Sequence, residues 1–278
     1  AIALVLRLAW ALYAAREPNA LYGGDQTAYL EAGRSIARGD GYTSLVTGTA
    51  TAFWPPGYPL VVAALSLLVD RLPVPGELPV WLAVFQAVAG ASAVVPVWWL
   101  ARAATGRGRA GVIAAALTAC WPSLVLYTAT AHLETVFITV LLWSLVLLAR
   151  GSTGLGGVAL GFTVLVRPFA LPVVALVALA RRSPRPALVV LAVVVAVQVP
   201  WVVRNAVVLD AFVPSSTNAG DTLCIDHRDD GNGRFAFADE CFAGLDDVPI
   251  ERLEVERNER NVREALRWTL DHPRAELA

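Results

Sequence analysis

Residues 23–42 read GGDQTAYLEAGRSIARGDGY, a polar stretch that lies between two strongly apolar parts of the chain. Four of its residues are spaced by four, three and four positions, which places them on one face of a helix: Asp25, Tyr29, Ala32 and Ile36. Gly39 follows as a helix-ending residue. The pattern predicts a helix that carries the Asp25 carboxylate at the head of its buried face.

The composition is that of a membrane protein. Hydrophobic residues make up 56% of the 278 residues and charged residues 16%, whereas soluble domains average roughly 25% charged residues. The chain contains neither Met nor Lys and opens within an apolar stretch, so we expect a fragment that lacks its natural start. We predict an all-α integral membrane protein, and we expect no nucleic-acid partner.

Arginine clusters orient the apolar segments across the membrane. Glu134 is the only acidic residue between Glu77 and Asp210, whereas arginines gather at three places in that stretch: 102–109, 150 and 181–185. Such clusters mark cytoplasmic loops. The first helix then runs outward, and four more spans follow it: 80–101, 110–128, 135–149 and 186–203.

The apolar segment 155–180 fits this orientation only if it is broken. As one span it would carry Arg181, Arg182 and Arg185 to the outer side. The Arg167-Pro168 pair offers a break, because proline ends a helix and freed backbone groups are tolerated where protein or water covers them. Two short helices that meet at this pair would return the arginines to the cytoplasm.

The topology divides the chain into two regions. Residues 1–205 form the transmembrane region, whose long first extracytoplasmic loop, 16–79, contains juxtamembrane helices. Residues 206–278 form an extracytoplasmic segment that leads to spans beyond the chain. This segment carries 16 acidic residues against 8 arginines, so we expect it to be solvated. An amphipathic helix is predicted from Pro249 to Asp271, with one apolar stripe: Ile250, Leu253, Val262, Leu266 and Leu270.

Most of the remaining polar residues gather on the outer side. They are Asp25 in the first loop, His132 and Glu134 in the turn TATAHLET, Arg167 at the break and Arg204 at the exit of the last span. Arg7 lies about 10 Å below the outer end of the first helix by helical rise. A charge inside the membrane is a functional candidate because it is costly to keep there.

Each of these residues also has a purely structural explanation. Asp25 is of a type that caps helix N-termini. The other four residues have these structural explanations: a snorkelling anchor for Arg204, a helix-end cap for Arg167, a counter-ion for Glu134 and an interfacial histidine with satisfied hydrogen bonds for His132.

A second motif, FWPPGYP at 53–59, combines aromatic residues suited to the membrane interface with prolines suited to a helix start. Together with Asp25, Tyr29 and the GDGY end of the first motif, it resembles the GT-C superfamily of membrane glycosyltransferases. More narrowly, it is similar to glycosyltransferase family 39, which contains protein O-mannosyltransferases and aminoarabinose transferases. The resemblance extends over the order of spans in residues 1–205.

This resemblance implies a GT-C-like helical bundle in the bacterial plasma membrane, with the active site on its extracytoplasmic face. It implies a polyprenyl-phosphate-linked sugar as donor and Asp25 as the catalytic residue. Gln26 stands where protein mannosyltransferases have glutamate, which counts against a protein acceptor. The acceptor stays open among lipid, glycan and protein.

A phosphate leaving group departs as a stable anion and needs positive charge rather than a strong acid. The expected donor-phosphate and substrate ligands are Arg167, Arg204, Glu134, Tyr29, Arg7, His132 and Tyr58. One carboxylate acting as base in a single displacement predicts inversion at the anomeric carbon. The first loop lacks a DxD pair, so a divalent metal is left unassigned and no cofactor is expected.

Two other classes of protein remain as alternatives. A secondary transporter would also keep buried arginine and glutamate, but its polar groups would lie near the membrane midplane in both halves. A non-catalytic membrane scaffold would need no free carboxylate at Asp25.

The three cysteines divide by location. Cys224 and Cys241 lie in the outer segment, where thiols oxidise, whereas Cys120 lies in a membrane helix. We predict a disulfide between Cys224 and Cys241. A zinc site that adds His227 is the alternative, with a thin ligand set.

Overall fold

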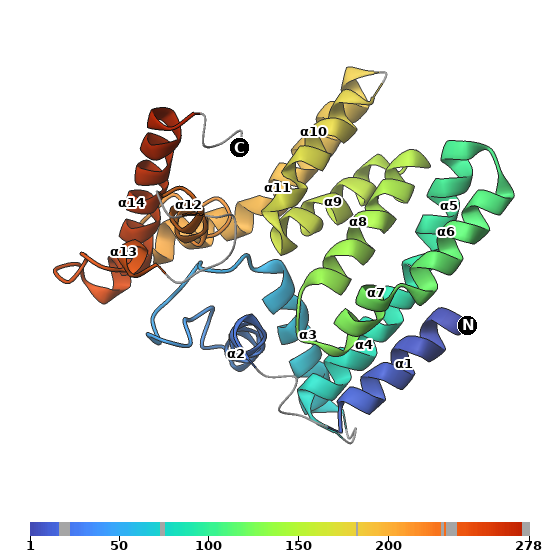
Figure 1. Cartoon of the computed structure of the whole chain (residues 1–278), viewed down its shortest axis with the longest axis horizontal. Helices are drawn as coiled ribbons and strands as arrows, with labels where there is room; N and C mark the ends of the chain where they lie inside the picture. Colours follow the sequence, from blue (N-terminus) through green and yellow to red (C-terminus); the bar gives the residue numbers. More distant parts are fainter. Residues whose placement is uncertain (17–22, 73–75, 182, 229–230, 232–237, 274–278) are drawn as a thin grey trace. The chain divides into compact units, whose positions relative to one another are not determined.

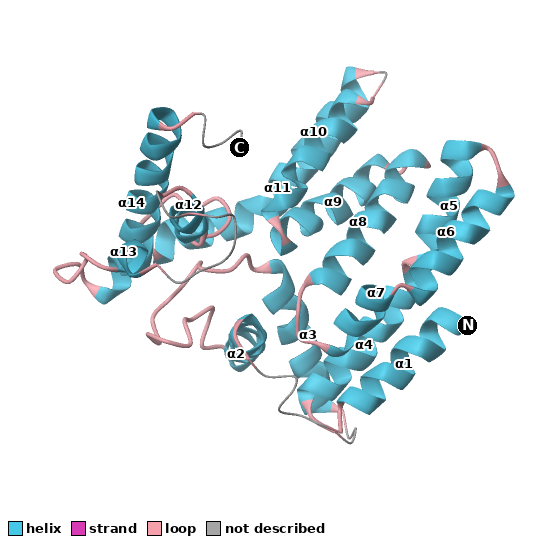
Figure 2. Ribbon diagram, viewed as in Figure 1, coloured by secondary structure: helices cyan, strands magenta, loops and turns pink. Residues whose placement is uncertain are grey.

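The computed structural model describes residues 1–16, 23–72, 76–181, 183–228, 231 and 238–273 (Figure 1). These residues form helices joined by loops (Figure 2), and the β pairing recorded among them is one isolated bridge between Thr43 and Ala50. The prediction of an all-α membrane protein is confirmed.

The described chain forms two compact units, which differ in their bounds from the regions 1–205 and 206–278. The first unit comprises residues 1–41 and 55–200, and the second comprises residues 42–54 and 201–278. The second unit therefore includes a piece of the first loop.

The helices of the first unit follow one another in this order: α1 Ile2–Ala14, α2 Asp25–Arg38, α3 Gly57–Arg71, α4 Leu78–Ser92, α5 Val94–Thr105, α6 Gly108–Cys120, α7 Pro122–Leu126, η2 Tyr127–Ala129, α8 Glu134–Ala149, α9 Thr153–Val166, η3 Pro168–Ala170, α10 Leu171–Leu179 and α11 Pro184–Val208. The end of α11, from Trp201 on, belongs to the second unit.

Two helices of the described chain are long and apolar enough to cross a membrane, Leu78–Thr105 and Pro184–Val208. The predicted span 110–128 is a bent pair instead, in which α6 and the helix Pro122–Ala129 meet at 55°. The bend has a local cause, because Pro122 has no N–H and favours the extended conformation seen at Trp121, with ψ of 119°.

The remaining apolar helices are shorter than a full span. α1 has 13 residues and α8 has 16, whereas a bilayer-crossing helix needs about 20. α9 and the helix 168–179 are also in this shorter class. The predicted order of apolar segments is thus present, but several of the segments are shorter than the predicted spans imply.

α9 and α10 turn back on one another at Arg167-Pro168, as predicted. Arg167 ends α9 in an extended conformation, with φ of −152° and ψ of 113°. After the turn, Arg181 Nη1 donates a hydrogen bond of 3.1 Å to the carbonyl oxygen of Leu148. The end of α10 therefore lies at the end of α8, beside Arg150.

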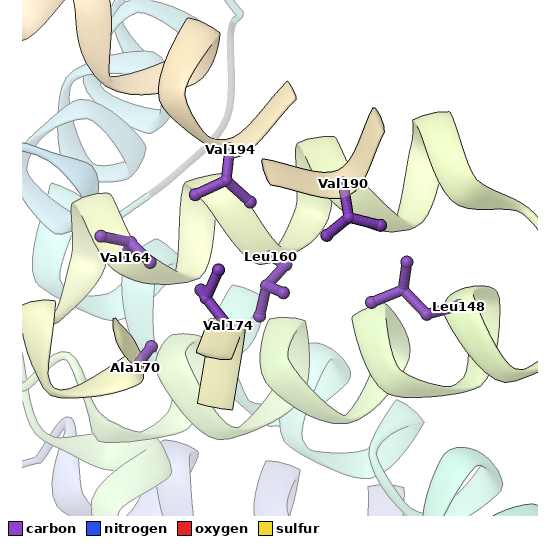
Figure 3. Close-up of a cluster of buried hydrophobic side chains, with 7 residues drawn as sticks. All are labelled: Leu148, Leu160, Val164, Ala170, Val174, Val190 and Val194. Carbon is purple, nitrogen blue, oxygen red and sulfur yellow. The ribbon is translucent and has the colours of Figure 1, made fainter. Parts of the chain in front are cut away.

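A cluster of buried aliphatic side chains holds these helices together. Figure 3 shows how they converge from five elements, α8, α9, η3, α10 and α11: Leu148, Leu160, Val164, Ala170, Val174, Val190 and Val194. Gly161 allows α9 and α11 to approach closely, because a Cβ there would lie 2.9 Å from Val197 Cβ. The hairpin is thus packed against α11.

The second unit contains the end of α11 with α12 Ala219–Asp226, α13 Asp239–Phe242 and α14 Ile250–Asp271. A disulfide joins Cys224 to Cys241, with an S–S distance of 2.11 Å and Cα atoms 5.9 Å apart, as predicted. Because each sulfur is bonded to the other, the zinc alternative with His227 is wrong. Cys120 is free and exposed.

The predicted apolar stripe of α14 is wrong. Three of its members are exposed, Ile250, Leu266 and Leu270. The buried residues of the helix are Val255, Asn261 and Ala265. Asn261 Nδ2 donates 3.0 Å hydrogen bonds to Asp221 Oδ1 and to the Cys241 carbonyl oxygen. Hydrogen bonds from Asn261 therefore hold the buried face of α14, where an apolar stripe was predicted.

Candidate active site

Asp25 is the first residue of α2, and the cap position belongs to Gly24. Gly24 has φ of 51°, a backbone conformation that glycine adopts easily. The structural explanation of Asp25 as the N-cap is therefore wrong. The Asp25 side chain is exposed, and no residue of the described ranges donates a hydrogen bond to it. Gly39 ends the helix at φ of 87°, as predicted.

The buried face of α2 rests on α3. Tyr29 and Ala32 are buried as predicted, and Ile36 is half-buried. The close contact comes from Gly33, where a Cβ would lie 2.4 Å from Val62 Cγ1. A glycine at this position lets the two helices touch, and this fixes the helix that carries Asp25.

Gln26 ties the start of α2 to the turn TATAHLET. Its Oε1 accepts a hydrogen bond of 3.1 Å from the backbone N–H of Ala131. The next residues of that turn are His132, Leu133 and Glu134. Gln26, which departs from the protein mannosyltransferase pattern, thus holds Asp25 close to the titratable side chains of His132 and Glu134.

The FWPPGYP motif places the start of α3 against the end of α9. Gly57 opens α3 after Pro56, and a Cβ on Gly57 would lie 2.5 Å from the backbone nitrogen of Val166. Only glycine fits this contact without moving the backbone. Arg167 follows Val166 directly after the end of α9, so the motif also packs against the break at Arg167-Pro168.

Tyr58 is fully buried next to this contact. Its hydroxyl donates to Gln86 Oε1 at 3.2 Å, and its ring meets that of Tyr29 edge to face, with centroids 5.2 Å apart. Gln86 Nε2 donates in turn to the carbonyl oxygen of Thr130 at 2.6 Å. Sequence reasoning missed Gln86, although a lone amide inside the apolar segment 80–101 was a usable signal.

Glu134 forms an ion pair with Arg167. Glu134 is the first residue of α8, and its Oε1 lies 3.4 Å from Arg167 Nη1. The counter-ion role predicted for Glu134 is therefore confirmed for one carboxylate oxygen. The other oxygen, Oε2, is buried and without a hydrogen-bond partner, whereas the Arg167 side chain is 48% exposed.

His132 packs its ring edge to face against Tyr127, with centroids 5.8 Å apart. Its Nδ1 is buried and has no hydrogen-bond partner. The explanation of His132 as a satisfied histidine is wrong for this nitrogen.

Electrostatic interactions join these side chains into one site. Partial desolvation raises the pKa of the Asp25 carboxyl above its ordinary value of 3.8, His132 opposes the rise, and Glu134 adds to it. Burial also raises the pKa of Tyr29, with further contributions from Asp25 and Glu134 against Arg167. We call these five residues the Asp25 cluster: Asp25, Tyr29, His132, Glu134 and Arg167. All of them belong to the first unit.

Arg7 occupies a different environment, inside the helices of the first unit. It is 1% exposed and donates to the carbonyl oxygens of Ala3 at 3.1 Å, Ala119 at 2.9 Å and Thr118 at 3.0 Å. The Thr118 carbonyl would normally accept from residue 122, which is proline and has no N–H. Arg7 therefore caps the end of α6 at its bend.

Arg204 belongs to the second unit and binds the loop piece 42–54. Its guanidinium donates to the carbonyl oxygens of Tyr42 at 2.8 Å and Thr51 at 2.6 Å. It also lies over the rings of Tyr42 and Trp201, 5.8 and 5.1 Å from their centroids. These contacts give Arg204 a clear structural role.

Glu254 holds the same loop piece from α14. Its carboxylate accepts from Thr51 Oγ1 at 2.5 Å, from the Ala52 N–H at 2.8 Å and from Thr217 Oγ1 at 2.5 Å. The sequence offers no signal for this residue, because it is one of 16 acids in its segment.

No group of three His, Cys, Asp or Glu side chains is placed to hold a metal ion within the described ranges.

The fold and the Asp25 cluster define an all-α membrane protein with a candidate acid–base site at the ends of its helices. The model of glycosyltransferase family 87 matches residues 53–242, which is more than half of the chain. The chain belongs to glycosyltransferase family 87 and is a glycosyltransferase, rather than a transporter or a scaffold.

The matched range contains His132, Glu134 and Arg167 but starts after α2. The narrower likeness to family 39 stays a resemblance. No curated protein and no solved structure gives a significant match.

Proposed function

We propose that the protein transfers a sugar from a polyprenyl-phosphate donor to a hydroxyl group of the acceptor, with inversion at the anomeric carbon. Asp25 is the base. The observation that carries the proposal is the position of its carboxyl, which begins α2 and serves no cap. Partial desolvation, with a smaller contribution from Glu134, raises the pKa of this carboxyl. A base whose pKa is moved toward the working pH is more effective than an ordinary carboxylate.

The transfer is a single displacement. The acceptor O–H gives its proton to an Asp25 oxygen while the acceptor oxygen attacks the anomeric carbon. The bond from that carbon to the phosphate oxygen breaks, and its electron pair leaves with the phosphate. One carboxylate is sufficient for this route, and no covalent sugar–enzyme intermediate forms.

Positive charge for the leaving phosphate comes from Arg167. The two arginines predicted for this role differ in their contacts. Arg204 donates to two backbone carbonyls at 2.6 and 2.8 Å, whereas Arg167 is half exposed and contacts Glu134 at 3.4 Å. Arginine suits the task because it keeps its charge and can bind two phosphate oxygens at once. Arg204 instead holds the loop piece 42–54.

Tyr29 and Tyr58 position the base. Their edge-to-face contact lies between α2 and α3, and the Tyr58 hydroxyl is bonded to α4 through Gln86. His132 lies near enough to Asp25 to oppose the rise in the pKa of its carboxyl. The first-loop motifs therefore act mainly by holding Asp25 in place.

The Asp25 cluster lies on the extracytoplasmic face of a bacterial plasma membrane in this proposal. Arg150 and Arg181 lie together at the end of α8 opposite to Glu134, where the positive-inside rule puts the cytoplasm. The disulfide between Cys224 and Cys241 also suits an oxidising compartment. A lipid-linked sugar can reach such a site from the membrane.

A donor assay tests the proposal. Membranes that contain the protein are given radiolabelled polyprenyl-phosphate sugars or, in parallel, the matching nucleotide sugars, and label is followed into lipid, glycan and protein fractions. We expect transfer from one of the lipid-linked donors. Transfer from nucleotide sugars after polyprenyl-phosphate sugars have been removed would reject the donor class.

A further inference from the structure

The peptide group between Thr130 and Ala131 is held on both sides by glutamine side chains. Gln86 Nε2 of α4 donates a hydrogen bond of 2.6 Å to the Thr130 carbonyl oxygen, and Gln26 Oε1 of α2 accepts one of 3.1 Å from the Ala131 N–H. The carbonyl and the N–H of one trans peptide point in opposite directions. The two glutamines therefore fix this peptide from opposite sides, and we call the arrangement the glutamine clamp.

The amide of Gln86 uses its donor and its acceptor at once. Besides its bond to Thr130, its Nε2 lies 3.4 Å from the Thr128 carbonyl oxygen, and its Oε1 accepts from the Tyr58 hydroxyl at 3.2 Å. The side chain is 0% exposed. An amide inside an apolar helix is costly unless its hydrogen bonds are made. Neither an ionised carboxylate nor an apolar side chain could make both sets of bonds.

These contacts close a ring around the start of α2. The Tyr58 ring meets that of Tyr29 with centroids 5.2 Å apart, and Tyr29 lies about one helical turn after Asp25. The ring of contacts runs from α2 through α3 and α4 to the turn TATAHLET, and it returns to α2 at the residue after Asp25. His132 and Glu134 closely follow the clamped peptide. The clamp therefore holds Asp25 relative to these two side chains.

We propose that Gln26 and Gln86 are positioning residues for the glycosyl transfer, an inference that rests on the role of Asp25 in the proposed function. They act through the clamped peptide, which places His132 and Glu134 beside Asp25. Neither glutamine reacts with the donor or the acceptor.

A glutamine rather than a glutamate at position 26 fits this role. A glutamate could accept from the Ala131 N–H equally well, but it would add a carboxylate next to Asp25. A like charge favours the protonated form of Asp25, which cannot act as a base. Titratable and charged groups of α2, α3, the turn and the end of α9 already interact with Asp25 or with one another at this site: Tyr29, Tyr58, His132, Glu134 and Arg167.

Four variants test the clamp. Gln26→Ala and Gln86→Leu each remove one side of it, the double variant removes both, and Gln26→Glu keeps the acceptor for the Ala131 N–H. Gln26 is only half-buried, so its two single variants test the clamp even if Gln86→Leu fails to fold. Gln198→Leu is the matched control, because Gln198 also donates to backbone carbonyl oxygens of α9 and α11 in the first unit, at 2.9 and 3.2 Å, but lies outside this site.

The measurement is the rate of transfer from the polyprenyl-phosphate sugar of the donor assay, over a range of pH, by the protein in nanodiscs. We expect Gln26→Ala and Gln86→Leu to lower kcat about 10- to 100-fold, as misplaced reacting groups do, while the donor KM changes less than about threefold. The double variant should lose little more than the slower single variant, because both substitutions act on one peptide.

The conservative variant and the control separate positioning from stability. Gln26→Glu should recover kcat at high pH, with the acid limb of the pH–rate profile moved upward, because a like charge raises the pKa of the Asp25 carboxyl. Gln198→Leu should lower the melting temperature and leave kcat, the donor KM and the pH–rate profile unchanged.

Three results would overturn the inference: an equal kcat and pH–rate profile in the wild type, Gln26→Ala and Gln86→Leu; effects that multiply in the double variant; or a Gln26→Glu variant as slow as Gln26→Ala at every pH. If any of these accompanies a loss of transfer in Asp25→Asn, the inference fails and the proposed function stands. Wild-type turnover in Asp25→Asn, or no transfer from any lipid-linked donor, would remove the proposed function and the inference with it.

Discussion

Asp25 stands at the first position of α2, one residue after the cap, so the helix N-terminus leaves its carboxylate available. Sequence spacing could place Asp25 at the head of the helix, but it could not decide whether the carboxylate caps that helix. The answer depends on one residue of register. The role proposed for Asp25 depends also on the neighbours His132 and Glu134, which come from a turn more than 100 residues away. Such neighbours have no local signal in the sequence.

Asp25→Asn should leave the protein as stable as the wild type, or more stable, at pH 7. The pKa of Asp25 is raised in the folded state above its ordinary value of 3.8, so the folded protein binds this proton more tightly than the unfolded chain. The contribution of Asp25 to stability is therefore lost as pH rises through the interval between the two pKa values. Thermal unfolding in detergent at pH 4 and pH 7 measures it, and a large loss of stability in the variant at pH 7 would contradict this environment.

Arg167→Lys and Arg204→Lys should have different effects. Lysine at 167 should raise the donor KM, because the bidentate contact to phosphate is lost. Lysine at 204 should lower the melting temperature and change the donor KM little, because Arg204 bonds two carbonyls of the loop piece 42–54. Hydrogen bonds to charged groups contribute about 1.5–3 kcal/mol each. A raised donor KM in Arg204→Lys, together with an unchanged donor KM in Arg167→Lys, would assign the donor phosphate to Arg204 instead.

At the scale of elements, prolines and glycines decide where the helices break and touch. The break at Arg167-Pro168 and the end of α2 at Gly39 were predicted from the sequence, because their causes are local. The bend at Trp121-Pro122 has the same cause but was missed, since the apolar run 110–128 hides it. Gly33 and Gly57 were missed for another reason: their contacts, Val62 and Val166, are fixed only by packing.

Gly57→Ala should destabilise the protein and reduce transfer. Its Cβ would lie 2.5 Å from the backbone nitrogen of Val166, so α3 and the end of α9 must separate and move Arg167. Overpacking of this kind costs about 1–3 kcal/mol. Gly154→Ala is the matched control, because Gly154 lies in α9 with nothing within 4 Å of an added Cβ. Melting temperature and transfer rate are measured for both, and equal behaviour of the two variants would refute the role of this contact.

At the scale of the whole molecule, the sequence predicted the class, the order of apolar segments and the disulfide, but it divided the chain differently. Residues 42–54 follow α2 in sequence, yet they belong to the second unit, where Arg204 and Glu254 bind them. The hydropathy pattern of α14 also led to a wrong prediction, because Asn261 is buried in this helix and Leu270 is exposed. Hydropathy does not predict a hydrogen-bonded interior of this kind.

Cysteine labelling tests the orientation. In a background with Cys120→Ser, single cysteines replace Arg107, Arg181 or Asp210, and intact cells are treated with a membrane-impermeant thiol reagent. We expect only the cysteine at 210 to react, since Asp210 has a 95% exposed side chain in the second unit. Permeabilised cells serve as the control for all three. Reaction at 181 without reaction at 107 would contradict the return of α10 to the cytoplasmic side.

The proposed role of Asp25 as the base is tested by the rate of sugar transfer in Asp25→Asn, with Asp40→Asn as the matched control. Asp40 lies in the same loop and pairs with Arg38 at the surface. We expect Asp25→Asn to lower turnover about 100- to 10,000-fold, the usual contribution of a general base. Asp40→Asn should keep the wild-type rate, and the wild-type product should have inverted anomeric configuration. Wild-type turnover in Asp25→Asn, or a retained configuration in the product, would contradict it.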